Sequence, residues 1–114
     1  MRILKFTDSI AWQKARVITK QSYTLFKDSK DFAFKDQICR ASISIMNNIA
    51  EGFERQTNKE LKNFLYIAKG STGEVHSMAY SALDLGYISQ PQFEELEAQL
   101  IETAKVISGL IKTL

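Results

Sequence analysis

Four long stretches of the chain repeat apolar residues every three or four positions, and no stretch alternates apolar and polar residues as a strand does. They run from about Ser9 to Lys27, from Phe32 to Arg55, from Thr57 to Gly86, and from Ser89 onward. This spacing predicts four amphipathic helices, each with one apolar stripe. Because short connections between long helices favour antiparallel neighbours, we expect an all-α, antiparallel up-and-down four-helix bundle that forms one domain over residues 1–114.

Local signals at the helix ends support these boundaries. Side chains that accept backbone hydrogen bonds favour helix starts, and a glycine with a left-handed conformation favours a helix end. The expected signals are Asp31 as a cap, a capping box of Thr57 and Glu60, Gly86 as a stop, and a capping box of Ser89 and Gln92 with Pro91 in the first turn.

The composition of the chain is that of a folded protein. A quarter of the 114 residues are charged, 45% are hydrophobic, and there is one proline, which together argue against disorder. The single Cys39 excludes an intramolecular disulfide. The amino terminus lacks the apolar core of a signal peptide, and no later run is long enough to span a bilayer. We therefore expect a cytoplasmic protein with no membrane partner.

The stretch Arg40–Arg55 places poor helix formers inside a helical pattern. Glycine costs about 1 kcal/mol relative to alanine in a helix, so Gly52 indicates packing or recognition. At 100° per residue, Gly52 falls on the buried side and permits close helix approach, while a polar ladder lies beside it. The ladder contains Arg40, Ser44, Asn48, Glu51 and Arg55. It is either a seam in which Asn48 fixes the register against a neighbouring helix, or part of a ligand or RNA site.

Positive charge is unevenly distributed. Residues 1–69 carry 13 Lys and Arg against 7 acids, whereas residues 70–114 carry 2 against 6. Arg16, Lys20 and Lys27 lie within about 40° of one another on the outer face of the first helix, and are candidate phosphate contacts. A looser row on the third helix contains Lys59, Lys62 and Lys69. The alternatives are charges that meet across helices or subunits, and ordinary solvated helix faces.

The outward side of the third helix carries small residues between two tyrosines. The set is Tyr66, Gly70, Gly73, Ser77 and Tyr80. Small residues let another backbone approach and tyrosines anchor interfaces, so the set predicts a subunit interface of a homo-oligomer. The alternative is ordinary helix surface.

Enzymatic chemistry finds little support in the sequence. His76 is the only histidine and has no second ligand at metal spacing, and Cys39 has no histidine nearby in sequence. Gly70 and Gly73 lie inside a predicted helix and form no phosphate loop. We expect no catalytic residues, metal, cofactor or small-molecule substrate.

Five segments of the chain together form a recognisable pattern. They are Trp12–Ala15, Asp36–Ile45, Asn48–Phe53, Phe64–Ser71 with Glu74, and Leu85–Ile88. In residues and order they resemble the four-helix-bundle proteins encoded in intervening sequences of bacterial 23S rRNA genes. This resemblance implies a bundle that assembles as a ring, commonly a homopentamer, in a bacterial cytoplasm. It also implies a ribosomal or rRNA-associated label that comes from gene position, without an established catalytic activity.

A more distant resemblance is to the accessory variability protein of diversity-generating retroelements, a basic pentamer that binds nucleic acid and a reverse transcriptase. The present chain differs in its net charge of only +2. It also has Cys39 where the family often has a second basic residue, and Met46 where proline is common.

Two functions therefore stay open at the level of sequence. The first is a non-enzymatic oligomer that binds RNA or a ribonucleoprotein through repeated cationic faces. Its candidate residues are Arg16, Lys20, Lys27, Arg40 and Arg55. The second is a protein-interaction scaffold that binds no nucleic acid.

Overall fold

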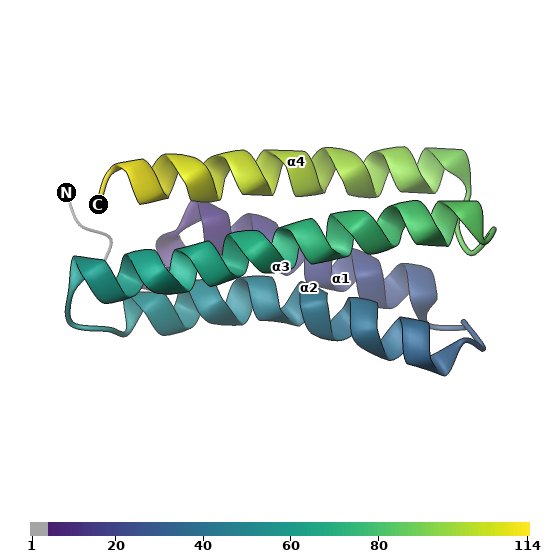
Figure 1. Ribbon diagram of the computed structural model, residues 1–114, viewed down its shortest axis with the longest axis horizontal. Coiled ribbons are helices and arrows are strands. Elements are labelled where there is room, and N and C mark those ends of the chain that lie inside the picture. Colours follow the sequence, from purple (N-terminus) through teal and green to yellow (C-terminus); the bar gives the residue numbers. More distant parts are fainter. Residues whose placement is uncertain (1–4) are drawn as a thin grey trace.

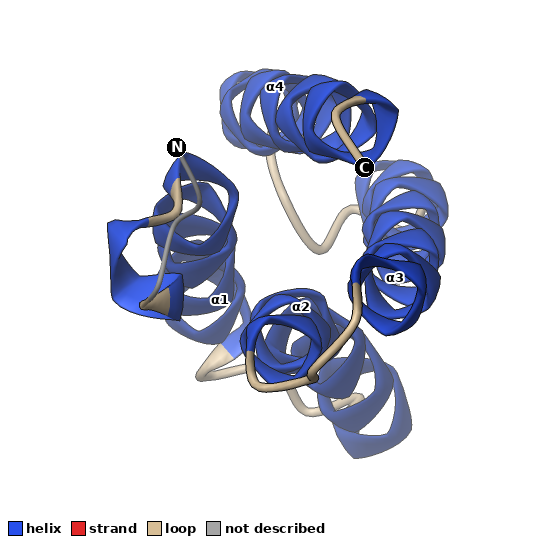
Figure 2. Cartoon of the chain, turned by 90° about the vertical axis from the view of Figure 1, so that its left-hand side faces the viewer, coloured by secondary structure: helices blue, strands red, loops and turns tan. Residues whose placement is uncertain are grey.

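The computed structural model describes residues 5–114 as four long α-helices preceded by a 3-10 helix, η1 (Phe6–Asp8). The long helices are α1 (Ile10–Phe26), α2 (Phe32–Phe53), α3 (Asn58–Asp84) and α4 (Gln90–Lys112). Consecutive helices run in opposite directions along a body of 44 × 22 × 19 Å (Figure 1) and follow one another around the core in chain order (Figure 2). The predicted up-and-down bundle is confirmed, with helix ends within about two residues of those expected. The sequence did not predict η1.

The core contains one apolar stripe from each helix. Ile18 of α1, Ile45 of α2, Leu65 of α3 and Leu100 of α4 are all fully buried. Removing such side chains from water is the main favourable contribution to folding, at roughly 25 cal/mol per Å² of apolar surface.

Four positions differ from the apolar spacing, which favours Phe64 and Ala104 as buried and leaves Thr103 and Cys39 outside the apolar stripes. Thr103 is buried in α4 and donates its hydroxyl to the carbonyl oxygen of Gln99 at 2.7 Å, whereas Ala104, which the pattern favoured, is half-buried. Cys39 is buried although its angle put it beside the apolar face, and Phe64 is only half-buried. Each helix packs against two neighbours, so its flanks are covered as well as its central stripe.

A side-chain cap forms at each of the three predicted starts, and two of the three predicted signals are present in full. Asp31 caps α2 and Ser89 forms a full capping box with Gln92 at α4. The predicted box at α3 is only half present, because Thr57 accepts from the Glu60 backbone N–H at 3.2 Å but the Glu60 carboxylate accepts from the Thr57 hydroxyl instead of its backbone N–H.

Gly86 ends α3 as predicted. It has a φ of +73°, which side chains other than glycine rarely adopt. The backbone N–H groups of Tyr87 and Gly86 donate to the carbonyl oxygens of Ala82 at 2.8 Å and Leu83 at 3.1 Å. This is a Schellman motif, which turns the chain toward α4.

Helices α2 and α3 meet along a polar seam. The Ser44 hydroxyl lies 2.9 Å from that of Ser71, and the Asn48 amide donates to the Ser44 carbonyl and hydroxyl oxygens at 2.8 and 2.9 Å. One side chain thus ties the hydroxyl pair between helices to the α2 backbone. Both acceptors of Asn48 belong to α2, so the hydrogen bond between the helices is that of Ser44 and Ser71, and a role of Asn48 in helix register stays a prediction.

Gly52 lies at the end of this seam, where α3 comes close to the α2 backbone. A Cβ atom at Gly52 would come within 2.9 Å of Leu61 Cδ1 and 3.0 Å of Phe64 Cβ. The Leu61 methyl can rotate away, but the Cβ of Phe64 is fixed to the α3 backbone. A larger residue therefore requires the helices to separate.

We predict that Gly52→Ala lowers the free energy of unfolding by about 1–3 kcal/mol, because overpacking outweighs the roughly 1 kcal/mol gain in helix propensity. The matched control is Gly109→Ala, where an added Cβ meets no atom within 4 Å. Urea unfolding should show no loss for the control. Equal stability of the two variants would contradict the close approach.

Candidate functional site

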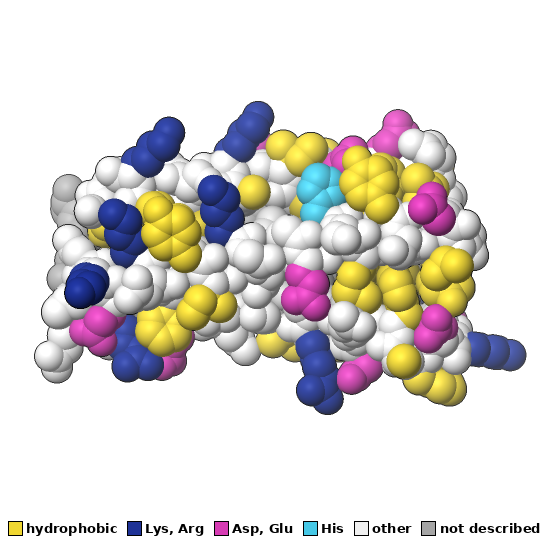
Figure 3. Space-filling model, in the orientation of Figure 1, with side chains coloured by type: hydrophobic (Ala, Val, Ile, Leu, Met, Phe, Trp, Pro, Cys, Tyr) yellow, Lys and Arg dark blue, Asp and Glu magenta, His cyan; other side chains and the backbone are white. Residues whose placement is uncertain are grey.

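The outer surface between α3 and α4 forms a groove with a volume of about 530 Å³. Cations from both helices reach it, and the described residues that line it include no Asp or Glu. In Figure 3, dark blue side chains gather over the second half of α4 and the first half of α3. We call this surface the lysine groove and define it by Lys69, Lys105 and Lys112.

The three lysines of the groove come from regions that the sequence analysis treated as opposites. Lys69 belongs to the basic part of the chain, whereas Lys105 and Lys112 are the only two cations of the acidic part. Within residues 5–114, none of the three makes an ion pair. Folding therefore concentrates unpaired positive charge that the sequence does not show as a cluster.

Small residues leave the backbone accessible along the groove. Gly73 and Gly109 line it from opposite sides, and a Cβ atom at either position would meet nothing within 4 Å. The polar hydroxyl of Ser108 lies on the same lining. The groove can thus accept a bulky anion close to two helices.

A hydrogen-bonded cluster lies at one end of the lysine groove. Nε2 of His76 lies 2.8 Å from Oε2 of Glu97, and the Tyr80 hydroxyl donates to the same oxygen at 2.8 Å. The Tyr80 ring stacks on His76 and packs against Phe93. The hydrogen bonds from His76 and Tyr80 lower the pKa of Glu97, and the bond to Glu97 raises the pKa of Tyr80. The cluster ties α3 to α4.

The predicted row on α1 is exposed. Arg16, Lys20 and Lys27 all face solvent and have no ion-pair partner in the described part of the chain. The Arg16 guanidinium lies over the Trp12 ring at 5.7 Å from its centre. These three residues stay candidates for phosphate contacts.

The two other predicted cations already have carboxylate partners. Arg40 pairs with Asp36 at 2.9 Å within α2. Arg55 pairs with Glu51 at 2.6 Å, reaches Glu60 at 4.0 Å, and lies over the Phe64 ring. Glu51 thus acts with Arg55 at the end of the α2–α3 seam. Both arginines are less available to an external anion than the groove lysines.

The five residues of the predicted subunit interface all lie on the surface. Nothing lies within 4 Å of a Cβ atom built at Gly70 or Gly73, and Ser77 is exposed. Tyr66 is 54% exposed. Tyr80 is also exposed, but its hydroxyl and ring already have partners in the same chain. A subunit interface on this face stays a prediction.

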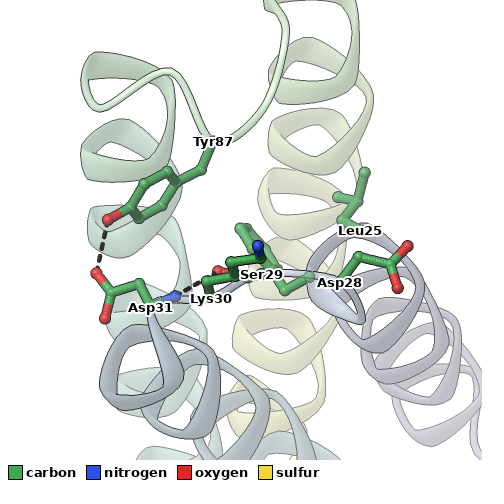
Figure 4. A pocket seen from close by; sticks show the side chains of 7 residues that line it. Leu25, Asp28, Ser29, Lys30, Asp31 and Tyr87 are labelled. Carbon is green, nitrogen blue, oxygen red and sulfur yellow. Dashed lines mark hydrogen bonds between the residues drawn. The ribbon is translucent and has the colours of Figure 1, made fainter.

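A second hollow lies where the α1–α2 and α3–α4 connections meet (Figure 4). Its volume is about 490 Å³, and the Tyr87 hydroxyl donates to Oδ2 of Asp31 at 2.6 Å across it. The other oxygen of Asp31 caps α2 through the backbone N–H of Phe34. The bond from Tyr87 lowers the pKa of Asp31. This hydrogen bond joins the α1–α2 connection to the α3–α4 connection.

Residues 5–114 contain no group of three or more His, Cys, Asp or Glu side chains placed to hold a metal ion. Over the same residues, no helix combines the length and apolar character needed to cross a membrane.

The sequence pattern of the 23S rRNA-intervening sequence proteins matches residues 7–109. The chain belongs to this family. The predicted resemblance is confirmed over most of the chain.

A crystal structure of a family relative supports the same fold. It is a protein of unknown function from the S23 ribosomal protein family of Bacteroides thetaiotaomicron, with 26% sequence identity and a TM-score of 0.81. The similarity covers 90% of the present chain and 99% of the Bacteroides chain. A search of the curated proteins finds no match.

Two segments through which the chain resembles the 23S rRNA-intervening sequence proteins lie in the α2–α3 seam. Asn48–Phe53 contains the amide and the glycine of the seam, and Phe64–Ser71 contributes the facing hydroxyl. Lys69 of the second segment faces the lysine groove. These two segments therefore contain residues that pack α2 against α3, together with one lysine of the lysine groove.

We predict that Glu97→Gln reduces stability most near neutral pH. A carboxylate with a lowered pKa contributes stability above its unfolded pKa, about 4.3, and loses that contribution as the pH falls through its folded pKa. The difference in free energy of unfolding between wild type and variant should therefore shrink between about pH 5 and pH 3.

Urea unfolding over this pH range provides the measurement. The control is Glu94→Gln, which changes the same charge at an exposed position of α4. A difference for Glu97→Gln that is equal at neutral and acid pH would contradict the role of its carboxylate in the cluster.

Proposed function

We propose that the protein is a non-enzymatic homo-oligomer that binds RNA, alone or in a ribonucleoprotein, through its exposed cationic surfaces. The observation that carries this proposal is the convergence of three unpaired lysines on one groove without a carboxylate in its lining. Solvated helix faces normally mix both signs of charge, whereas the charged side chains described on the lining of this groove are all positive. Neighbouring amines without a carboxylate raise the local positive potential. A bound polyanion relieves their repulsion.

Phosphate is the anion that suits this groove. Lysine ammonium groups bind phosphate as point charges, and a groove between two helices can follow a chain of phosphates. Lys105 and Lys112 are seven residues apart on α4, or about 10 Å along the helix axis, and so contact different phosphates. Among polyanions we name RNA because the family takes its name from 23S rRNA genes, which is a genetic association and not a record of binding.

Self-assembly would multiply a modest site. Three lysines in one groove give limited affinity, whereas a ring repeats the groove around one axis and increases the number of phosphates bound at once. The resemblance implies a pentamer. Gly70 and Tyr66 of α3, which lie outside the groove lining, support an interface next to the groove.

A protein-interaction scaffold is the second candidate. Ile67 and Tyr66 are neighbouring exposed apolar residues on α3, with exposed fractions of 51% and 54%. A surface of this kind fits a protein partner without requiring any anion.

We predict that wild-type protein binds a labelled RNA duplex of about 20 base pairs, and that a triple Lys→Gln change in the lysine groove weakens binding. Each lost phosphate contact should reduce the slope of log affinity against log salt by nearly one. The altered residues are Lys69, Lys105 and Lys112. Fluorescence anisotropy between about 50 and 200 mM salt measures this.

The control for the RNA measurement removes the same charge elsewhere, in a triple Lys→Gln variant of Lys5, Lys14 and Lys30. We expect it to keep most of the affinity and slope. Equal losses in the two triple variants would show that only net charge matters, and no binding by wild type at low salt would favour the scaffold.

We also predict a mass in sedimentation equilibrium of several times 13.0 kDa, five times for a pentamer. Gly70→Gln should lower this mass, because its side chain would stand between two backbones at the predicted interface. Thr24→Gln, on the exposed outer face of α1, is the matched control and should leave the mass unchanged. A wild-type mass of one chain would exclude the oligomer.

A further inference from the structure

Two exposed aromatic rings flank a third hollow, between α1 and the start of α2. Tyr23 is 45% exposed and Phe32 is 72% exposed. The hollow between them has a volume of about 520 Å³. We call it the aromatic hollow and define it by Tyr23 and Phe32. Neither ring fills the core, and two exposed rings beside one hollow are typical of a surface that contacts another molecule.

The floor of the aromatic hollow is small and uncharged. Ala33 and Cys39 line it, and Cys39 is buried. Burial raises the pKa of the Cys39 thiol, which keeps it neutral. The one carboxylate of the lining, Asp36, is engaged by Arg40 at 2.9 Å. A flat, uncharged ring therefore fits between the two aromatic walls.

Cations surround the aromatic hollow on the α1 side. Relative to Tyr23, Lys20 is three residues before, Lys27 is four residues after, and Arg16 is seven residues before, so all three share its helix face. Lys35 lies on the rim, where its ammonium donates to the Lys27 carbonyl oxygen at 2.8 Å. The row of candidate phosphate contacts on α1 thus has the Tyr23 ring among its members' side chains.

We propose that the aromatic hollow receives an unpaired base of RNA, which stacks on Tyr23 and Phe32 while Arg16, Lys20 and Lys27 hold the adjoining phosphates. This inference rests on the proposed function and specifies the chemistry recognised at the α1 surface. The lysine groove supplies only cations, whereas this surface combines the cations and the Tyr23 ring of one α1 face with the Phe32 ring of α2.

An unpaired base fits this surface better than other occupants. Single-stranded nucleic acid is bound by cationic surfaces that track the backbone and by aromatic side chains on which bases stack. Bases within a duplex are already stacked on one another and cannot enter a hollow in a helix surface. An apolar protein side chain would fill the hollow without engaging the cations around it.

The test compares two RNA probes, a single-stranded oligouridine and an RNA duplex, by fluorescence anisotropy. Tyr23→Ala and Phe32→Ala should each weaken single-strand binding roughly tenfold, with duplex binding and the salt slope unchanged, because no phosphate contact is removed. Tyr23→Trp preserves a stacking surface and should retain single-strand affinity. Ile10→Ala, at an exposed apolar position of α1 outside the hollow, is the negative control.

Ultraviolet crosslinking followed by mass spectrometry adds a positional readout. We expect crosslinked uridine on peptides that contain Tyr23 or Phe32. Circular dichroism melting of each variant checks that the fold is unchanged, which exposure of both side chains favours.

The outcomes separate this inference from the proposed function. If wild type binds both probes and the two alanine variants bind the single strand normally, the base site is wrong while RNA binding stands. If wild type binds neither probe at low salt, both proposals fail. If Phe32→Ala changes the assembled mass and leaves RNA affinity intact, the hollow is a protein contact and the inference is overturned.

Discussion

The close contact between α2 and α3 is the constraint on which the rest of the bundle depends. Gly52 brings α2 against Leu61 and Phe64 of α3, and the side chains of Ser44, Ser71 and Asn48 form a hydrogen-bonded chain along the same seam. Since buried and half-buried polar groups need partners, the Ser44–Ser71 pair favours the register in which these two hydroxyls meet. Once the register is set, the opposite flank of α3 can only face α4, and the lysine groove forms between them.

The cations of the bundle differ in whether a carboxylate pairs with them. The two arginines of the Arg40–Arg55 stretch form ion pairs. Arg40 pairs with Asp36, and Arg55 pairs with Glu51. Within residues 5–114, two outer surfaces carry unpaired cations, the lysine groove between α3 and α4 and the row on α1 beside the aromatic hollow. The end of α4 and the α1–α2 connection lie at opposite ends of the bundle (Figure 1). A ring would repeat both surfaces.

The fold can be predicted from the sequence because local signals and apolar spacing agree. Gly86 ends α3 and Ser89 starts α4 as expected, since both act through neighbouring backbone groups. The burial of Cys39 and Thr103 is harder to predict because it depends on which helix covers each flank. The lysine groove was not predicted at all: Lys105 lies in an acidic part of the chain and meets Lys69 only through the packing of α3 on α4. No signal within one helix could have shown this.

The central claim is that the Arg40–Arg55 stretch is architectural and that recognition occurs on the outer cationic surfaces. Asn48→Ala tests it most directly, with unfolding free energy and RNA affinity measured on the same preparation. The Asn48 amide bonds only within the seam, so the account predicts a loss of about 1 kcal/mol in stability and unchanged RNA affinity of the folded protein. Unchanged stability together with a large loss of RNA affinity would contradict it, because Asn48 would then contact the ligand.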